Sequence, residues 1–480
     1  MLLNPPSNVA GNVPRDLLWG CWCKGKRIAG INFPPISLLQ MDSILSVFGH
    51  TSLYLDAQAE KKSMIEVEKF VEQKQPDLVI IPTSTMTYNE DAANLKRLKD
   101  KYDGLKTLAF GSHATFEPFA ALQREGVDFI AMKEHEYIVR DLVNAMEKGE
   151  DYSKIKGLGF KKDGKTIINE EYPFIENLDE LPFPNRKLIL EFEYFNPIVK
   201  RLPWTTAITS KGCPAQCNFC TSPTFYGNTW RARSAKNVAD ELEYLADLGY
   251  KEVFFRDETF TANRKRTVEI CNEIKERKIE MEWICSSRVV TVDKQLMQMM
   301  KDAGCHMIRF GVESGDQQVL NNIKKGITVE RTQKIFKEAN EVGMETHAHV
   351  MIGNLGDTKE TVEKTIKFVK SIKPTTATFG AFTPYAGTPI FEIVKAKHPE
   401  VGDGSESSLS TLHSTGYHSE DLCNLSSEQV GNYVRRAYKE FYLRPSYMLQ
   451  TLRKINSTDE LRRTIGAALQ VTSYATTDSE

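Results

Sequence analysis

The sequence predicts an α/β protein with two successive arrays of alternating strands and helices, followed by a small helical region. Two observations predict this class. Residues 1–148 alternate short apolar strands with amphipathic helices, and residues 205–392 repeat a strand followed by a helix six times. Such alternation places the strands side by side in a parallel sheet that helices cover. A length of 480 residues leaves room for about two to four domains.

The composition is that of a globular enzyme, with 41% hydrophobic and 26% charged residues. A formal net charge of −2 gives no indication of a nucleic-acid surface. No apolar run approaches the roughly 18 residues that a membrane span needs, and residues 1–6 lack the plan of a signal peptide. The nine cysteines are odd in number and partly clustered, which predicts a location in the reducing cytoplasm.

The N-terminal third predicts a doubly wound parallel sheet, a fold that binds ligands beyond the carboxyl ends of its strands. The strands are expected at 1–4, 52–56, 78–82, 107–111 and 129–132. The helices are expected at 37–48, 63–73, 89–101, 116–123 and 137–148. A linker should follow, in which Asp163-Gly164 turns a hairpin and the prolines of residues 177–184 favour an extended connector.

The second array predicts six strands, each followed by a helix. The strands are expected at 205–210, 252–256, 282–285, 307–312, 345–352 and 376–382. The helix at 234–248 shows the pattern: Ser234 caps it, apolar residues form one stripe, and Gly249 ends it. In parallel barrels the residues at the carboxyl ends of the strands carry the chemistry.

The C-terminal region predicts a loop-like stretch at 393–425 and helices at 428–442, 446–455 and 459–469. These helices should close the second array and shape its pocket. A solvated helical face is favoured for their basic residues, although contact with a membrane surface or an anionic substrate stays open. These residues are Arg435, Arg436, Lys439, Arg444, Arg453, Lys454, Arg462 and Arg463.

Three cysteines form the most specific motif of the chain, because Cys213, Cys217 and Cys220 stand at C-x-x-x-C-x-x-C directly after a predicted strand. Three thiolates bind a 4Fe–4S cube and leave one iron without a protein ligand, where a chelating cosubstrate can bind. A zinc site would usually need a fourth Cys or His, and no second C-x-x-C occurs in the chain. Three unrelated buried cysteines at this spacing are the weaker alternative.

This spacing, with Phe219 just before the last cysteine, resembles the radical S-adenosylmethionine (SAM) superfamily, and the upstream third resembles its cobalamin-binding branch. The resemblance implies an open (β/α)₆ partial barrel and three cofactors: a 4Fe–4S cluster, SAM and cobalamin. It implies domain limits at 1–150 for the cobalamin-binding domain, 151–200 for a linker with a hairpin, 201–395 for the barrel, 396–472 for the helical region and 473–480 for a disordered tail.

The resemblance also implies the residues of two binding sites. The SAM site is expected to include Phe219, Asp257, Glu258, Ser286, Arg288, Glu313, Ile352 and Gly353. The cobalamin site is expected at two loops, Ser84-Thr85-Met86 and Gly111-Ser112-His113. One departure concerns cobalt, because the family motif D-x-H-x-x-G needs a His in the first loop and the chain has none before His50. Cobalamin should therefore have a different lower ligand or be left five-coordinate.

Several tempting residues receive a structural interpretation. His113 and His135 are expected to pack in loops or to contact the nucleotide tail rather than to bind cobalt, and Cys21 and Cys23 are treated as ordinary residues. His347 and His349 share one face of a strand, where substrate binding, proton transfer and simple core packing stay open. For Arg231 and Arg233, an anionic partner and solvation both stay open. No single residue is identified as catalytic.

The resemblance implies that the protein cleaves SAM to a 5′-deoxyadenosyl radical, which removes a hydrogen atom from an unactivated carbon of a small-molecule, lipid-like or tetrapyrrole-like substrate. Methylation of that carbon is the favoured outcome, under anaerobic conditions and with an external flavodoxin-like or ferredoxin-like electron donor. Cyclisation, ring rearrangement or oxidation with the same cofactors is the alternative. A sensor that binds iron–sulfur or cobalamin without turnover is the second alternative.

Overall fold

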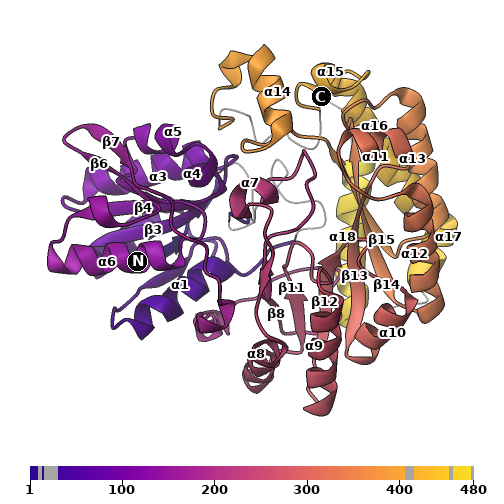
Figure 1. Ribbon diagram of the computed structural model, residues 1–480, viewed down its shortest axis with the longest axis horizontal. Helices are drawn as coiled ribbons and strands as arrows, with labels where there is room; N and C mark the ends of the chain where they lie inside the picture. Colours follow the sequence, from indigo (N-terminus) through magenta and orange to yellow (C-terminus); the bar gives the residue numbers. More distant parts are fainter. Residues whose placement is uncertain (9–12, 16–30, 406–415, 453–457, 477–480) are drawn as a thin grey trace.

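The protein consists of an N-terminal sheet domain and a half-barrel that lie side by side, with helix α14 above the boundary between them (Figure 1). The computed structural model describes residues 1–8, 13–15, 31–405, 416–452 and 458–476. Cys21 and Cys23 lie outside the described residues, as do Arg453 and Lys454.

The N-terminal sheet has seven strands in the order β2-β1-β3-β4-β5-β6-β7. Five of them pair in parallel, as predicted: β1 (Leu2–Asn4), β2 (Tyr54–Asp56), β3 (Leu78–Thr83), β4 (Lys106–Gly111) and β5 (Phe129–Ala131). The helices are α1 (Ile36–Val47), α2 (Met64–Lys74), α3 (Tyr88–Lys101), α4 (Ser112–Phe116), α5 (Pro118–Gln123) and α6 (Glu136–Lys148). Separate apolar cores lie on the two faces of the sheet, one under α1 and α6 and the other under α2, α3 and α5.

The structure differs from the sequence prediction at two places in this domain. The hairpin of β6 (Leu158–Lys162) and β7 (Lys165–Ile168) is part of the sheet rather than of a linker, because β6 pairs antiparallel with β5. The single helix expected at 116–123 is two helices, since Pro118 begins α5 and cannot continue the hydrogen bonding of α4.

The connector after the hairpin is tied to both domains. It contains the 3₁₀ turns η3 (Leu178–Glu180) and η4 (Arg186–Ile189). Another 3₁₀ turn, η2 (Tyr152–Lys154), lies before the hairpin. Asn185 donates to Asp42 of α1 over 2.7 Å, and the buried Arg186 pairs with Glu241 of the half-barrel at 2.9 Å. These contacts fix the path between the two domains.

The second sheet is a parallel half-barrel in the order β15-β14-β13-β12-β11-β8. Its strands, in chain order, are β8 (Trp204–Ala207), β11 (Glu252–Phe255), β12 (Glu282–Ser287), β13 (Cys305–Glu313), β14 (Glu345–Ile352) and β15 (Thr376–Ala381). The helices are α8 (Ala235–Asp247), α9 (Arg264–Glu276), α10 (Lys294–Asp302), α11 (Gln317–Asn322), α12 (Val329–Val342) and α13 (Lys359–Ile372). Ser234 accepts a hydrogen bond from Asn237 N, as the predicted cap requires.

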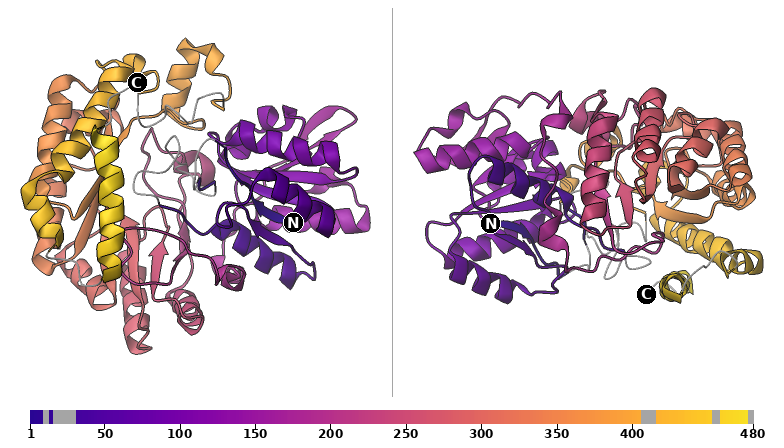
Figure 2. Two further views of the ribbon diagram at one scale, coloured as in Figure 1. Left: turned by 180° about the vertical axis from the view of Figure 1, so that it is seen from behind. Right: turned by 90° about the horizontal axis from the view of Figure 1, so that it is seen from below.

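The C-terminal helices join the two edges of the half-barrel. They are α14 (Pro389–Lys397), which the 3₁₀ turn η5 (Pro399–Val401) follows, α15 (Ser419–Leu422), α16 (Ser427–Tyr442), α17 (Pro445–Leu452) and α18 (Thr458–Thr476). At the β15 edge, Tyr442 Oη donates to Ala377 O over 2.6 Å and accepts from Ala377 N over 3.0 Å. At the other edge, Arg463 of α18 donates to the carbonyls of Val199 and Lys200, just before β8. Figure 2 shows α18 running along this side.

Two predictions for this region are wrong. Residues 473–476 belong to α18 rather than to a disordered tail, and residues 477–480 lie outside the described part of the chain. Arg463 is buried at 8% exposure rather than on a solvated face. Within the described residues, none of the helices combines the length and the apolar character that crossing a membrane requires.

Candidate functional site

The three motif cysteines lie in the loop that follows β8, at the carboxyl ends of the half-barrel strands. The short strand β9 (Ser210–Lys211) enters this loop and pairs with β10 (Arg231–Ala232), while α7 (Ser222–Tyr226) follows it. Gly212 adopts a φ of 87°, and a Cβ there would lie 2.3 Å from Thr229 O. Only glycine therefore allows the two flanks of the cysteine loop to approach so closely.

The cysteine environment fits an iron–sulfur cluster. Cys213 and Cys217 are buried, Cys220 is half-buried, and none of the three forms a disulfide. Burial raises the pKa of the Cys220 thiol to about 12, with Cys217 and Cys213 as further contributors. Among the described residues, the three sulfurs do not form a group in which every pair lies within 4.8 Å, as the ligands of a single ion would. A four-iron cube spans a wider set of thiolates than zinc does.

Groups from neighbouring strand ends contact these sulfurs. Thr259 Oγ1 lies 3.3 Å from Cys213 Sγ, and Arg288 Nη1 lies 3.5 Å from Cys217 Sγ. Lys325 Nζ lies 5.6 Å from the centre of the Phe219 ring. The site therefore supplies hydrogen-bond donors and positive charge to an anionic cluster.

The acidic pair after β11 divides into two roles. Asp257 is fully buried and accepts three hydrogen bonds of 2.6–2.7 Å, from Thr209 N, Thr209 Oγ1 and Ser210 Oγ. It therefore fixes the start of the cysteine loop. Glu258 accepts one hydrogen bond from Gly212 N over 3.1 Å, and burial together with Asp257 raises its pKa to about 7. Glu258 retains the capacity to meet a cationic group.

The other predicted SAM residues lie at the carboxyl ends of β12, β13 and β14 or directly after them. Ser286 is the second-to-last residue of β12, and Arg288 directly follows the strand. Glu313, at the end of β13, has a φ of 60°, which costs energy for any residue but glycine, and it pairs with Lys325 at 2.5 Å. The Ile352 side chain lies in the core under the outer helices. Only the backbone of Ile352 and Gly353 can therefore face the opening.

The interior of the half-barrel holds a buried polar row. Arg309 of β13 reaches His349 of β14 at 2.7 Å, and Nδ1 of His349 lies 2.8 Å from Thr378 Oγ1 of β15. His347 lies between Thr378, at 3.2 Å, and Thr376, at 2.7 Å. The predicted shared face of the two histidines therefore is the barrel interior.

A cavity separates the carboxyl end of the N-terminal sheet from the half-barrel. It contains about 970 Å³ of empty space, part of it open to solvent. Gly111 and Ser112 line it, together with His135, Ile208 and Tyr226. His135 stacks on Phe110 with ring centres 3.9 Å apart, and burial lowers its pKa. Gly111 and Ser112 of the loop after β4 therefore face the cavity, and His135 lies beside them.

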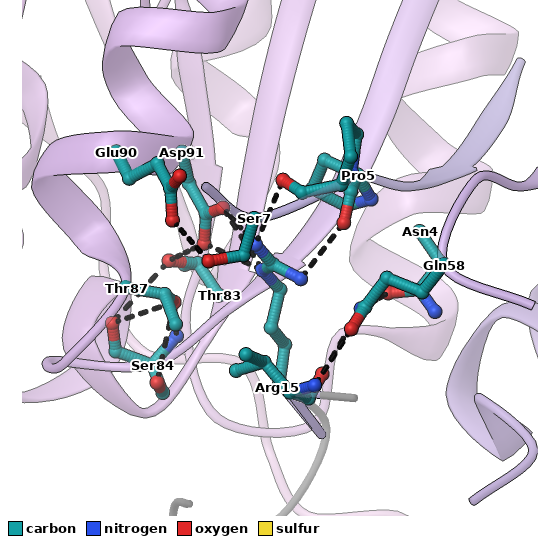
Figure 3. A network of polar contacts seen from close by, with 12 residues as sticks. Asn4, Pro5, Ser7, Arg15, Gln58, Thr83, Ser84, Thr87, Glu90 and Asp91 are labelled. Carbon is teal, nitrogen blue, oxygen red and sulfur yellow. Dashed lines mark hydrogen bonds and ion pairs between the residues drawn. The ribbon is translucent and has the colours of Figure 1, made fainter. Parts of the chain in front are cut away.

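The other predicted cobalamin residues are engaged in protein contacts. In Figure 3, Ser84 closes a turn with Thr87, and the buried Arg15 binds Asp91 through two contacts of 2.9 Å. Met86 packs against Tyr385 and Tyr417. His113 is fully buried, stacks on Tyr88 at 4.1 Å and lies 3.5 Å from Asp403, which agrees with the predicted packing role.

A buried ion cluster connects the two domains beside the cysteine loop. Lys211 pairs with Glu136, the first residue of α6, and lies 3.5 Å from Glu134. Arg231 pairs with Glu134 at 2.8 Å. Arg233 pairs with Glu241, so neither arginine that follows the cysteine loop is solvated. Sequence reasoning missed Lys211, Lys325 and Arg309 because their partners come from distant elements.

Comparisons with known proteins agree with this geometry. A family model described as the radical SAM superfamily matches residues 207–369, and one described as the B12 binding domain matches residues 29–143. An uncharacterized methyltransferase of Pyrococcus horikoshii is 32% identical over 89% of this chain and 92% of that protein. The chain belongs to the cobalamin-binding radical SAM enzymes.

This radical SAM enzyme also resembles an anaerobic magnesium-protoporphyrin IX monomethyl ester cyclase of Rubrivivax gelatinosus, which is 28% identical over 80% of this chain and 68% of that protein. Among solved structures, the cobalamin-dependent SAM radical enzyme OxsB with aqua-cobalamin bound is similar, with a TM-score of 0.71 and 17% identity. The match covers 92% of this chain and 70% of OxsB, and it shows the shared fold. A 4Fe–4S cluster, SAM and cobalamin are the cofactors of this family.

Proposed function

We propose that this radical SAM enzyme methylates an unactivated carbon of a small-molecule substrate. The observation that carries the proposal is the convergence of a three-cysteine loop and polar strand ends beside a cavity of the B12-binding domain. When bound, the cluster and SAM supply a 5′-deoxyadenosyl radical that removes a hydrogen atom, and cobalamin supplies the methyl group. The name of the 32% identical relative favours methyl transfer.

In this proposal Cys213, Cys217 and Cys220 hold the cluster, and the strand ends hold SAM. Glu258 accepts the SAM ammonium, because its carboxylate lies beside the cysteine loop and keeps spare acceptor capacity. Ser286 and Arg288 bind the carboxylate, and the Glu313–Lys325 pair binds the ribose hydroxyls. The backbone of Ile352 and Gly353, with Phe219 below it, contacts the adenine.

Cobalamin is proposed to bind at the cavity beside Gly111 and Ser112, rather than against the Ser84 turn. The cavity lies at the carboxyl ends of β4 and β5, where a doubly wound sheet binds its ligands. His135 supplies a stacked ring and a buried Nε2 without a hydrogen-bond partner among the described residues, so it can accept a hydrogen bond there. His113 is no cobalt ligand in this proposal.

The proposal includes an external flavodoxin-like or ferredoxin-like electron donor, because no protein group of the site can reduce the cluster. It also includes a location in the reducing cytoplasm, since the seven described cysteines are all free. Cyclisation without methyl transfer is the second candidate, because the 28% identical relative is a cyclase. Family membership favours both enzymes over a sensor.

The test is a product assay under anaerobic conditions on protein loaded with iron, sulfide and cobalamin. With SAM, a strong reductant and candidate substrates, we expect both 5′-deoxyadenosine and S-adenosylhomocysteine by mass spectrometry. Deoxyadenosine alone, with a cyclised product that has gained no methyl group, would favour the cyclase. Cys217→Ala should lose cluster iron and both products, whereas Cys423→Ala, at a half-buried cysteine outside the loop, should keep them. Unchanged iron in Cys217→Ala would contradict the cluster assignment.

A further inference from the structure

A cluster of two imidazoles and a carboxylate lies apart from the cysteine loop, among the C-terminal helices. His398 follows α14, while His418 and Asp421 lie at the start and within α15. His398 Nε2 is 2.6 Å from Asp421 Oδ2, and His418 Nδ1 is 3.8 Å from the same oxygen. One ligand atom from each residue lies within 4.8 Å of the others. We call these three residues the His398 cluster.

The hydrogen bonding of His398 requires either a proton or a metal ion between its Nε2 and the Asp421 carboxylate. Glu400 Oε1 lies 3.2 Å from Nδ1 of His398, so Nδ1–H donates to it. In a neutral imidazole, Nε2 then carries a lone pair that points at the Asp421 carboxylate. Two acceptors at 2.6 Å repel each other unless a proton or a metal ion lies between them. A carboxylate on the far nitrogen is the usual partner of a metal-binding histidine.

The donor set indicates the class of ion. Imidazole nitrogens with one carboxylate suit zinc and other divalent transition metals, whereas calcium and magnesium prefer oxygen ligands. Metal–ligand bonds of about 2.0–2.2 Å place neighbouring donor atoms roughly 3–4 Å apart. The three donor atoms lie within 4.8 Å of one another, and all three side chains are partly exposed, so an ion can enter from solution.

The cluster lies where the segment above the B12-binding domain meets the half-barrel. On one side, α14 leads to Asp403, which faces His113. On that same side, Tyr417 packs against Met86 of the B12-binding domain. On the half-barrel side, the carbonyl of Leu422 accepts from Gly356 N over 2.8 Å, in the loop after β14. An ion bound by the His398 cluster would therefore stabilise the segment that contacts both the B12-binding domain and the half-barrel.

We propose that His398, His418 and Asp421 bind one divalent transition-metal ion, with zinc as the reference ion and water in the remaining positions. The role is structural, because the cluster lies outside the cysteine loop and the cavity. Lys397 Nζ lies 3.3 Å from Asp421 Oδ1 and competes with the ion for that carboxylate. Removing Lys397 should therefore strengthen metal binding, although it removes an ion pair.

The experiment uses the full chain with its iron–sulfur cluster loaded and titrates it with zinc chloride. We expect one zinc per chain by plasma mass spectrometry, and only nitrogen and oxygen ligands by zinc X-ray absorption. His418→Ala and Asp421→Asn should each weaken binding at least tenfold. Lys397→Gln should tighten it several-fold. The matched control is His50→Gln, because His50 lies 3.8 Å from Glu147 without a second imidazole beside it among the described residues.

Any of four outcomes would overturn the proposal. Zinc could fail to remain on the chain, or sulfur could appear among its ligands. The zinc affinity of His418→Ala and Asp421→Asn could also equal that of the parent chain. The Lys397→Gln variant guards against a folding defect, because a misfolded chain cannot bind zinc more tightly. A weaker affinity in a folded Lys397→Gln variant would show that the cluster is only an ion-pair network.

Discussion

Nη2 of Arg309 donates a hydrogen bond to Nε2 of His349 over 2.7 Å, and this contact fixes both histidines in the half-barrel. A guanidinium has no acceptor, so Nε2 of His349 must be unprotonated and Nδ1–H donates to Thr378. The Thr378 hydroxyl then donates to Nε2 of His347, whose Nδ1–H donates to Thr376. The hydrogen bonds of this row therefore all donate in one direction, from Arg309 towards Thr376, and both imidazoles are neutral.

Removing Arg309 should release His349 from this state. Burial lowers the pKa of His349 well below 6.5, and Arg309 lowers it further. In Arg309→Met we expect the pKa of His349 to rise, which ring-labelled histidine NMR can follow, with His349→Gln giving the assignment. Arg309→Lys keeps a cationic donor and should keep the low pKa. An unchanged titration in Arg309→Met would contradict the proposed direction of the row.

Asp257→Asn should affect the cysteine loop rather than SAM directly. The amide replaces one acceptor oxygen with a donor that faces the hydroxyls of Thr209 and Ser210. Loss of a buried charge-assisted hydrogen bond costs roughly 1–3 kcal/mol. We expect a lower melting temperature and faster loss of iron from the loaded enzyme. A variant that keeps its iron and stability but loses SAM affinity would show that Asp257 contacts SAM after all.

The binding of SAM should weaken at low pH. With a pKa of about 7, Glu258 is increasingly protonated below neutrality and loses the charge that meets an ammonium group. Calorimetry on the cluster-loaded enzyme between pH 6 and 8.5 should show this dependence. Glu258→Gln should bind roughly tenfold more weakly, as expected for the loss of about 1.4 kcal/mol, and without the pH dependence. The exposed Glu360→Gln should behave like the parent enzyme.

Alkaline pH should weaken the amino-terminal end of the half-barrel. Burial opposes protonation of His306, but Glu252, at 2.8 Å, and Glu345, at 3.6 Å, raise its pKa to about 8. Because this pKa lies above the unfolded value of about 6.5, the stabilisation is complete below pH 6.5 and is lost as the pH rises through 8.

The expected loss is about 2 kcal/mol, at 1.36 kcal/mol per pKa unit. Melting temperatures between pH 6 and 9 should fall over this window in the parent chain and fall less in His306→Gln. His50→Gln serves as the control, because His50 lies outside the half-barrel. A fall that is equally steep in His306→Gln would assign the effect to another group.

Most of the fold could be predicted from the sequence because its strands are buried apolar runs of characteristic length. The predicted strand at 345–352 matches β14 to the residue. The place of the β6–β7 hairpin could not be predicted in this way. Its turn is a local signal, but its pairing with β5 depends on a contact between strands that the sequence does not encode locally. The break before Pro118 was visible in the sequence, since proline favours the first turn of a helix.

In the candidate site, too, features with a local sequence signal could be predicted, and features that depend on contacts between distant elements could not. The cysteine motif is local, so its residues could be predicted from spacing alone. The role of Asp257 could not, because it depends on where the loop after β8 lies relative to β11. The Ile352 side chain points outward because side chains alternate between the two faces of a strand. The sequence does not show which of the two alternating sets faces the barrel interior. The pair of Lys325 and Glu313 could not be predicted from local spacing either, because the two residues are 12 positions apart, on opposite sides of α11.

The ion pair between Lys211 and Glu136 has a consequence for the relative motion of the two domains. Lys211 stands two residues before Cys213, and Glu136 begins the helix that follows β5 of the B12-binding domain. Breaking a buried ion pair by removing one partner costs about 3–5 kcal/mol. The two cofactor-binding domains therefore do not separate freely during a catalytic cycle. Movements that admit substrate or release product should therefore leave this contact intact.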